Sequence, residues 1–325
     1  MTGLEMRVFL IAVLALLVVL VGAFVGAFFY FRDPDIPRAT LEAKYATPPS
    51  QFLILSDGAR AHVRDRGPRD APALLLLHGN QLSLFTWEPW ASRLDDTFRV
   101  VTMDLPAHGL TGTVPSGDYT QNGMVEFVKQ VADQLGLDKF AIGGHSMGGG
   151  IAARFAETYP DRVTQLVLVD AVGMPSKPPA KRPLIFRLLR APVLNQVLLH
   201  IAPRAMVAQT LNEGIVRKAI LTDAMIDQVR DFARMSGTRE ATFVRYGLPR
   251  DTYIKDHIGD IKAPTLILWG EADHDVPVAD AHGFAEAIAG SKLVIYPDTG
   301  HFSHEEMADQ SAADVRAFLL VTHKP

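Results

Sequence analysis

Near the middle of the sequence stands the stretch Ala141-Ile142-Gly143-Gly144-His145-Ser146-Met147-Gly148-Gly149-Gly150. Apolar residues before it predict a short buried strand, and the spacing of residues 151–159 after it predicts a helix. The glycines two residues before and after Ser146 indicate a tight turn, because side chains there would clash. Such a turn raises the serine hydroxyl above the backbone at a helix N-terminus, where developing negative charge is stabilised. A glycine-rich turn with an incidental serine is the alternative, and the rest of the chain distinguishes the two.

Composition limits the classes of protein that this chain can belong to. Its 325 residues carry a formal net charge of −4, which gives no bias toward nucleic acid. The chain has no cysteine, and this excludes disulfides, thiolate metal sites and cysteine nucleophiles. Hydrophobic residues make up 48% of the sequence, and the N-terminus supplies part of this share.

An apolar segment without a charged residue occupies positions 8–31. As a helix it would extend about 36 Å, against about 30 Å for the hydrocarbon core of a bilayer. It is longer than the apolar part of a signal peptide and ends in an aromatic cluster at residues 28–31, so we expect a retained single-pass membrane anchor. A cleaved signal peptide and a buried core helix are the alternatives. Basic residues on both sides leave the orientation open.

Strands and helices alternate through the globular part. Residues 51–64 predict a hairpin, and the continuously apolar runs at 73–77, 99–105 and 165–170 predict strands covered on both faces. A helix is expected at 121–135 between two of these strands. The alternation predicts an α/β fold with a doubly wound, mostly parallel sheet.

The alternation stops after Gly173 and resumes near Ile261. Between them, segments at 184–189, 194–201, 205–211 and 224–235 have helical spacing and predict an inserted helical cap with a basic, solvated entry. Strands follow at 265–269 and 292–296, and a last helix at 305–320. The predicted organisation is an N-terminal transmembrane anchor at 1–31, a proline-rich linker at 32–50, the first part of the core at 51–173, the helical cap at 174–237 and the second part of the core at 238–325.

Three polar side chains follow strands of this predicted sheet. Ser146 follows one strand, while Asp273 and His301 follow two consecutive parallel strands. The carboxyl ends of parallel strands meet at one edge of a sheet, so we expect the three side chains to face one crevice. The chain order serine, aspartate, histidine is the one expected for a serine at a tight strand-to-helix turn whose proton passes to a histidine that an aspartate orients. Asp275 is the competing carboxylate.

Each of these residue types suits nucleophilic catalysis. A serine hydroxyl is a weak nucleophile at neutral pH, so a base must take its proton, and His301 titrates in the right range. A carboxylate such as Asp273 fixes the histidine tautomer and stabilises the imidazolium. Two backbone N–H groups should bind the oxyanion, and we expect them at Met147 and at Asn80 in the loop after the first apolar strand.

From about residue 50 to residue 320 the sequence resembles the α/β-hydrolase superfamily. Five motifs carry the resemblance: His78-Gly79, Asp104-Leu105-Pro106-x-x-Gly109, Gly144-His145-Ser146-Met147-Gly148-Gly149, Gly270-x-x-Asp273-x-x-x-Pro277 and Gly300-His301. The resemblance implies Ser146 as nucleophile, His301 as base, Asp273 as its orienter, backbone oxyanion donors at Asn80 and Met147, and no cofactor. Haloalkane dehalogenases and epoxide hydrolases carry aspartate where this chain has Ser146, so both are disfavoured.

No metal site is expected. His78, His108 and His145 are interpreted as residues that shape loops, since no acidic or histidine partner stands at ligand spacing in the sequence.

The function that we expect is a membrane-tethered serine hydrolase. It would cleave small carboxylic esters, with an apolar or lipid-like acyl chain, through an acyl-enzyme on Ser146. An acyltransferase, a thioesterase or a carbon–carbon bond hydrolase could use the same triad. A non-catalytic ligand-binding protein of this fold is the alternative from another class. The expected partners are the ester substrate and the membrane, and not nucleic acid.

Overall fold

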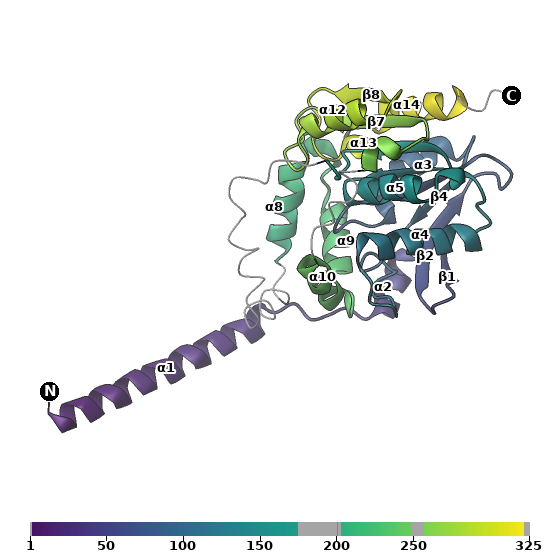
Figure 1. Ribbon diagram of the computed structural model, residues 1–325. Coiled ribbons are helices and arrows are strands. Elements are labelled where there is room, and N and C mark those ends of the chain that lie inside the picture. Colours follow the sequence, from purple (N-terminus) through teal and green to yellow (C-terminus); the bar gives the residue numbers. More distant parts are fainter. Residues whose placement is uncertain (1, 175–199, 201–202, 249–256, 322–325) are drawn as a thin grey trace. The chain divides into compact units, whose positions relative to one another are not determined.

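A computed structural model describes residues 2–174, 200, 203–248 and 257–321 (Figure 1). The chain forms two units. One holds Met1–Pro34 together with Arg182–Pro203, and the other holds Asp35–Lys181 together with Arg204–Pro325. The second unit contains the sheet and the candidate site.

The first unit contains helix α1, Gly3–Phe31. Its N-terminus is closed by a capping box, in which the Thr2 N–H donates to Glu5 Oε2 at 2.7 Å and the Glu5 N–H donates to Thr2 Oγ1. Within Gly3–Tyr30 the most apolar window of 18 residues has a mean hydropathy of 3.3 and is exposed throughout. The predicted long apolar helix is confirmed. By length and composition it could cross a membrane, and a signal sequence has the same properties.

The second unit is built on an eight-stranded sheet with the order β1-β2-β4-β3-β5-β6-β7-β8. Strand β2 is antiparallel to both of its neighbours, and the remaining pairs are parallel. The strands are β1 Ser50–Ile54, β2 Arg60–Arg66, β3 Ala73–Leu77, β4 Arg99–Met103, β5 Phe140–His145, β6 Val163–Val169, β7 Thr265–Gly270 and β8 Lys292–Tyr296. The predicted mostly parallel sheet and its hairpin are therefore confirmed.

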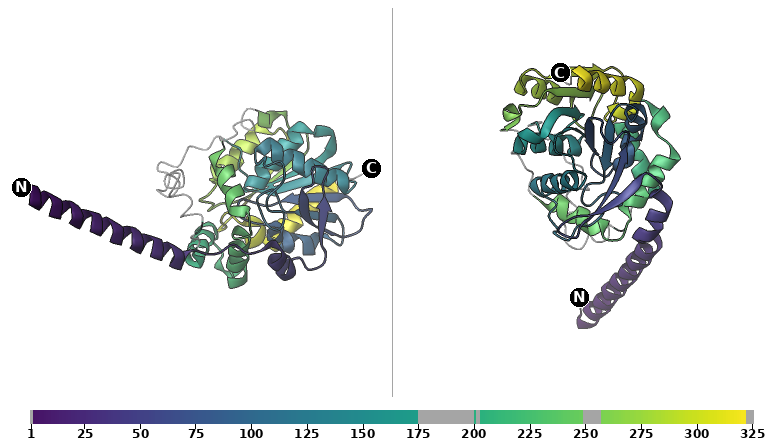
Figure 2. Two further views of the ribbon diagram at one scale, coloured as in Figure 1. Left: turned by 90° about the horizontal axis from the view of Figure 1, so that it is seen from below. Right: turned by 90° about the vertical axis from the view of Figure 1, so that its right-hand side faces the viewer.

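Helices cover both faces of the sheet (Figures 1 and 2). Alternate residues of β3 show why its sequence is apolar throughout. Leu75 and Leu77 lie in one hydrophobic cluster with α4 and α5, while Leu74 and Leu76 lie in the other cluster with α3 and α14. The helices of this unit outside the segment between β6 and β7 are α2 Arg38–Tyr45, α3 Glu88–Leu94, α4 Gln121–Gln134, α5 Met147–Thr158, α12 Val278–Ala287, α13 Ser303–Glu306 and α14 Ala308–Val321. Short 3₁₀ turns are found at η1 Leu84–Trp87, η2 Pro160–Arg162, η3 Lys218–Ile220 and η4 Ile258–Asp260.

Part of the predicted linker is helical. Helix α2 lies within residues 32–50, where Leu41 is buried and the Arg38 guanidinium donates to the carbonyls of Leu110 and Thr111, each at 2.9 Å. The prolines in this segment suggested an extended connection. Pro37 instead stands at the start of the helix, where its fixed φ is compatible with helical structure.

Three helices occupy the described part of the segment between β6 and β7: α8 Arg204–Gly214, α9 Asp223–Ala233 and α10 Thr238–Gly247. The helices expected at 205–211 and 224–235 correspond to α8 and α9, whereas α10 was not predicted. The helices expected at 184–189 and 194–201, and the basic residues of the cap entry, lie in the part of the chain that is not described, apart from residue 200. Leu211 and Ile226 form an apolar cluster with Leu82 and Phe302, so α8 and α9 pack over loops at the ends of the strands.

Candidate active site

Ser146 occupies the turn between β5 and α5, in the conformation that the glycine pattern predicts. Its φ is 50° and its ψ is −116°, a strained region for a residue with a side chain. A Cβ at Gly144 would lie 2.2 Å from the Gly148 carbonyl oxygen, and a Cβ at Gly148 would lie 2.2 Å from the Leu77 carbonyl oxygen. Only glycine fits at these two positions. The turn therefore places a buried serine at the N-terminus of α5.

His301 and Asp273 form a buried hydrogen-bonded pair. The Nδ1 atom of His301 donates to Asp273 Oδ2 at 2.7 Å. Asp273 Oδ1 accepts the backbone N–H groups of Asp275 at 2.8 Å and Val276 at 2.9 Å. Asp275 thus orients the carboxylate of Asp273 through its backbone. With the proton on Nδ1, the lone pair of His301 lies on Nε2, which is the atom that a base requires.

The electrostatic surroundings favour the protonated form of His301. Burial lowers the pKa of this histidine, but the hydrogen bond and negative charge of Asp273 outweigh burial, and the net effect raises the pKa above its usual value. Asp170 acts in the same direction when it is ionised. The imidazolium that forms when His301 takes a proton is therefore stabilised.

The serine and the histidine are linked through His145. The Nε2–H of His145, which directly precedes Ser146, donates to the His301 carbonyl oxygen at 2.7 Å, and the two rings lie 4.7 Å apart. The loop after β3 lies directly beside Ser146, because a Cβ at Gly79 would lie 3.3 Å from Ser146 Cβ. Asn80, the next residue of this loop, is exposed, and Met147 is half-buried at the first position of α5.

The loop that carries His301 is also joined to the end of α8. The His301 N–H donates to the Gly214 carbonyl at 2.8 Å. The carboxylate of Glu306 accepts the N–H of Gly300 at 2.9 Å through one oxygen, and the N–H groups of Val216 at 3.0 Å and Arg217 at 2.7 Å through the other. Sequence reasoning did not single out Glu306.

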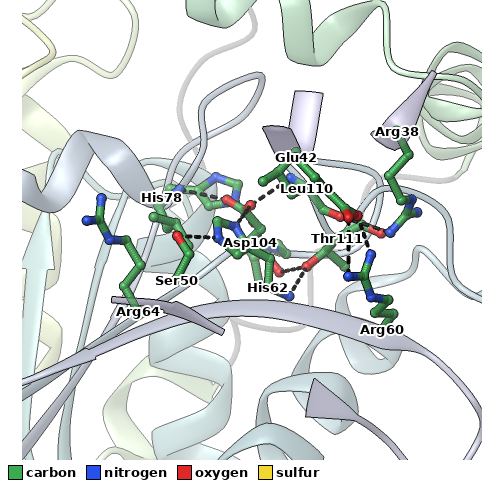
Figure 3. A network of polar contacts seen from close by, with 12 residues as sticks. Arg38, Glu42, Ser50, Arg60, His62, Arg64, His78, Asp104, Leu110 and Thr111 are labelled. Carbon is green, nitrogen blue, oxygen red and sulfur yellow. Dashed lines mark hydrogen bonds and ion pairs between the residues drawn. The ribbon is translucent and has the colours of Figure 1, made fainter. Parts of the chain in front are cut away.

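A polar network around Asp104 holds the loop after β3 in place (Figure 3). The carboxylate of Asp104 is fully buried and accepts His62 Nδ1–H at 2.6 Å, the Leu84 N–H at 2.8 Å and the Leu110 N–H at 2.7 Å. Leu105 directly follows Asp104 in the sequence, and its backbone N–H donates to Nε2 of His78 at 3.0 Å. His78 precedes the Gly79–Asn80 turn, so the network fixes the segment beside Ser146.

Asp170 is a second buried carboxylate beside the His301–Asp273 pair. It accepts the Gly270 N–H at 2.8 Å and the Ser303 hydroxyl at 2.6 Å. Burial and the neighbouring charge of Asp273 raise its pKa to about 8. Sequence reasoning missed Asp170, although it follows β6 as directly as Ser146 follows β5, and this position was the available signal.

Asp170 also lies in the group that the structure offers as a possible metal site. The ligand atoms of His145, Asp170 and His304 are buried and lie within 4.8 Å of one another. Spacing along the chain gave no sign of this group, because the sheet brings together residues that are far apart in the sequence. Their other contacts are structural: Nε2 of His145 bonds His301, Nε2 of His304 lies 2.8 Å from Thr86 Oγ1, and Asp170 holds Gly270 and Ser303.

Comparison with known proteins gives a consistent result. A family model described as alpha/beta hydrolase fold matches residues 72–308. A 2-hydroxy-6-oxononadienedioate/2-hydroxy-6-oxononatrienedioate hydrolase from Klebsiella pneumoniae is 29% identical over 284 residues, which cover 83% of this chain and 95% of that protein.

Solved structures share the fold. The crystal structure of a membrane phospholipase A, described as a bacterial virulence factor, has a TM-score of 0.72 at 24% identity and covers 98% of this chain and 100% of that one. A putative lipase from Acinetobacter baumannii AYE has a TM-score of 0.72 at 24% identity, with 89% and 98% of the two chains covered. Because the family model matches more than half of this chain, the chain belongs to the α/β-hydrolase fold family.

Proposed function

We propose that this protein is a serine hydrolase that cleaves carboxylic esters through an acyl-enzyme on Ser146. The observation that carries the proposal is the 2.7 Å bond from His301 Nδ1 to Asp273, at the edge of the sheet where Ser146 is held at a φ of 50°. A serine at such a turn, close to an aspartate-oriented histidine, has the arrangement needed for acyl transfer.

The reaction follows from these positions. Nε2 of His301 takes the hydroxyl proton as Ser146 Oγ attacks the ester carbonyl, and Asp273 stabilises the resulting imidazolium. The backbone N–H groups of Met147 and Asn80 are the proposed donors to the oxyanion. The imidazolium then protonates the departing alcohol. Water, deprotonated by the same histidine, releases the acid and restores the serine.

The proposed substrates carry an apolar acyl chain. Next to His301 in sequence, Phe302 joins an apolar cluster with Leu82, Leu211 and Ile226. Aliphatic and aromatic side chains beside a nucleophile favour an apolar acyl group over a polar one. A lipase and a membrane phospholipase A are among the proteins of similar fold, which agrees with this substrate class.

Carbon–carbon bond hydrolysis is a second candidate, favoured by one observation. The Klebsiella relative, 29% identical over 83% of this chain, is named for the hydrolysis of 2-hydroxy-6-oxononadienedioate and the corresponding trienedioate. Turnover of these two compounds, followed beside turnover of p-nitrophenyl esters, separates the candidates. Cleavage of the dioates with no turnover of any ester would replace the ester proposal.

Fluorophosphonate labelling tests the nucleophile. We expect the probe to modify Ser146 in the wild-type protein, and Ser146→Ala to lower ester turnover on the order of 10⁴-fold or more without unfolding. Ser50→Ala is the matched control, because the Ser50 hydroxyl also lies within hydrogen-bonding distance, 2.9 Å, of a buried histidine, His62, that is paired with an aspartate. In the Ser50→Ala variant, the fluorophosphonate probe should label Ser146 to the same extent as in the wild type. Probe attached to another residue, or most activity surviving in Ser146→Ala, would refute the assignment.

Helix α1 is proposed to be a retained membrane anchor. It is 29 residues long, and the likeness to a membrane phospholipase A extends over 98% of this chain, so it includes most of the helix. Membrane fractionation of the expressed full-length chain, followed by N-terminal sequencing, tests the proposal. We expect an intact N-terminus in the membrane fraction after a carbonate wash. A soluble product that begins after Phe31 would show that α1 is a cleaved signal.

A further inference from the structure

Helix α10 brings one arginine onto the nucleophile turn. Nη1 of Arg245 donates to Met147 Sδ at 3.4 Å, and Nη2 donates to the side-chain carbonyl of Asn80. Met147 and Asn80 are the two residues proposed to bind the oxyanion. The guanidinium of Arg245 therefore lies beside the position where the scissile ester group would bind.

The charge of Arg245 has no counter-charge in the described part of the chain. Several other half-buried or buried arginines there pair with carboxylates, as Arg66 does with Asp95 at 2.7 Å and Arg99 with Asp65 at 2.8 Å, whereas Arg38 binds two backbone carbonyls. The contacts of Arg245 are neutral: a thioether, an amide and the ring of Tyr246, 4.8 Å from the guanidinium carbon to the ring centroid.

Because the guanidinium of Arg245 is largely buried, the lack of a counter-charge raises the free energy of the folded protein. The Nε atom of Arg245 is buried and has no hydrogen-bond partner among the described residues. Burial lowers the pKa of the guanidinium, as expected when a cation loses water without gaining an anion. Removing a charge from water is unfavourable unless an ion of opposite sign accompanies it. An anion supplied by a ligand would satisfy both the charge and the free N–H.

The guanidinium is also held in place before any ligand binds. Tyr246, the next residue of α10, accepts hydrogen bonds at its hydroxyl from Asn80 Nδ2 at 3.1 Å and from Gln81 Nε2 at 2.8 Å. These bonds join α10 to the loop after β3. Arg245 thus has a fixed position relative to the nucleophile turn, and a fixed donor loses less conformational entropy when it binds.

We propose that Arg245 is a specificity-determining residue that binds an anionic oxygen group of the substrate, a carboxylate or a phosphate, close to the scissile ester. This inference rests on the proposed ester hydrolysis at Ser146 and narrows its substrate class to amphiphilic esters with one negative group. The planar guanidinium presents N–H donors at a spacing that matches both carboxylate and phosphate oxygens.

Two matched substrate pairs test the proposal and distinguish the two anions. Monoethyl adipate against diethyl adipate gives the carboxylate arm, and 1-acylglycerol 3-phosphate against 1-monoacylglycerol gives the phosphate arm. In each arm the measured quantity is the ratio of kcat/KM for the anionic ester to kcat/KM for the neutral ester. Arg245→Gln should lower this ratio about 10- to 100-fold in one or both arms, the range of a charged hydrogen bond. Arg245→Lys, which keeps the charge and loses the planar donor pair, should give an intermediate loss.

The control is Arg204→Gln in α8. Arg204 pairs with Asp223 and with Asp227, the latter at 2.6 Å. The Arg204→Gln variant should have the same ratio of kcat/KM for anionic to neutral esters as the wild type. A loss in one arm identifies the anion, and unchanged ratios in both arms for Arg245→Gln overturn the inference. Should that variant fail to fold, adipate and inorganic phosphate are tested as inhibitors of neutral-ester turnover by the wild type, where a lack of competitive inhibition overturns it. If the proposed ester hydrolysis at Ser146 is itself wrong, the wild type will turn over no ester and will take no fluorophosphonate label. That result differs from an active wild type whose ratios do not depend on Arg245.

Discussion

Two regions of this molecule contain nearly the same hydrogen-bonded pair. In the Asp104 network, His62 Nδ1 lies 2.6 Å from the aspartate oxygen, and in the candidate active site His301 Nδ1 lies 2.7 Å from Asp273 (Figure 3 shows the first). In the network the chain continues to a hydroxyl, since Ser50 Oγ lies 2.9 Å from His62 Nε2. By side-chain distances alone, the network has a complete serine–histidine–aspartate arrangement.

The backbone at the two serines is what differs. Ser50 is the first residue of strand β1 and pairs in register with Arg64 of β2. Ser146 has a φ of 50° and is followed directly by α5, whose first N–H groups are free to bind an anion. A histidine–aspartate pair can therefore be purely structural. The strained turn at a helix N-terminus is what adds a place to stabilise an oxyanion.

The carboxylates also face different surroundings. Burial opposes the charge on Asp104, but the neighbouring His62 outweighs burial, and the pKa of Asp104 is lowered below its usual value. Beside Asp273 stands a second carboxylate, Asp170, whose pKa burial and like charge raise to about 8. The network thus holds one anion with its partner. In the candidate site Asp170 is largely protonated near neutral pH, which leaves Asp273 as the charged partner of His301.

The largest expected effect is on turnover. Asp273→Asn should lower kcat on the order of 10⁴-fold, because an amide in place of the carboxylate leaves His301 in the wrong tautomer. Since Asp273 raises the pKa of His301, the acid limb of the kcat/KM profile should lie above about pH 6.5 in the wild type. The limb should move to lower pH in Asp273→Asn, because His301 then stays neutral further into acid.

Asp275→Asn is the matched control for this variant. Asp275 contacts Asp273 through its backbone N–H, which the substitution keeps, so its turnover should fall only slightly. A large loss in Asp275→Asn with a small one in Asp273→Asn would move the catalytic carboxylate to Asp275.

A smaller effect, on stability, is expected in the network. Asp104→Asn should lower the free energy of unfolding by about 1–3 kcal/mol, because it weakens buried hydrogen bonds that the carboxylate accepts from His62, Leu84 and Leu110. Urea denaturation followed by tryptophan fluorescence measures it, with Asp57→Asn in the exposed β1–β2 turn as a control expected within about 0.5 kcal/mol of the wild type. If Asp104→Asn is as stable as the control, the pair contributes little and the contrast with Asp273 disappears.

Local sequence patterns were sufficient to predict the sheet and the nucleophile turn. Continuous apolar runs identified the parallel strands, and glycines at fixed distances from Ser146 identified the turn, because both depend on neighbouring residues. Contacts between distant segments could not be predicted in this way. Arg245 reaches Asn80 across 165 positions, and His145 meets His304 only after the strands assemble. Helix α2, within the predicted linker, was not predicted because prolines end some helices and begin others.

The bonds of Glu306 have a consequence for recombination between hydrolases. Its carboxylate joins Gly300, next to His301, to Val216 and Arg217 just after α8. A chimaera that replaces the whole segment between β6 and β7 would exchange helices α8, α9 and α10 and also part of the scaffold of His301. Crossover points placed after Arg217 would retain these bonds. Within this chain, the end of α8 and the placement of His301 therefore depend on one another.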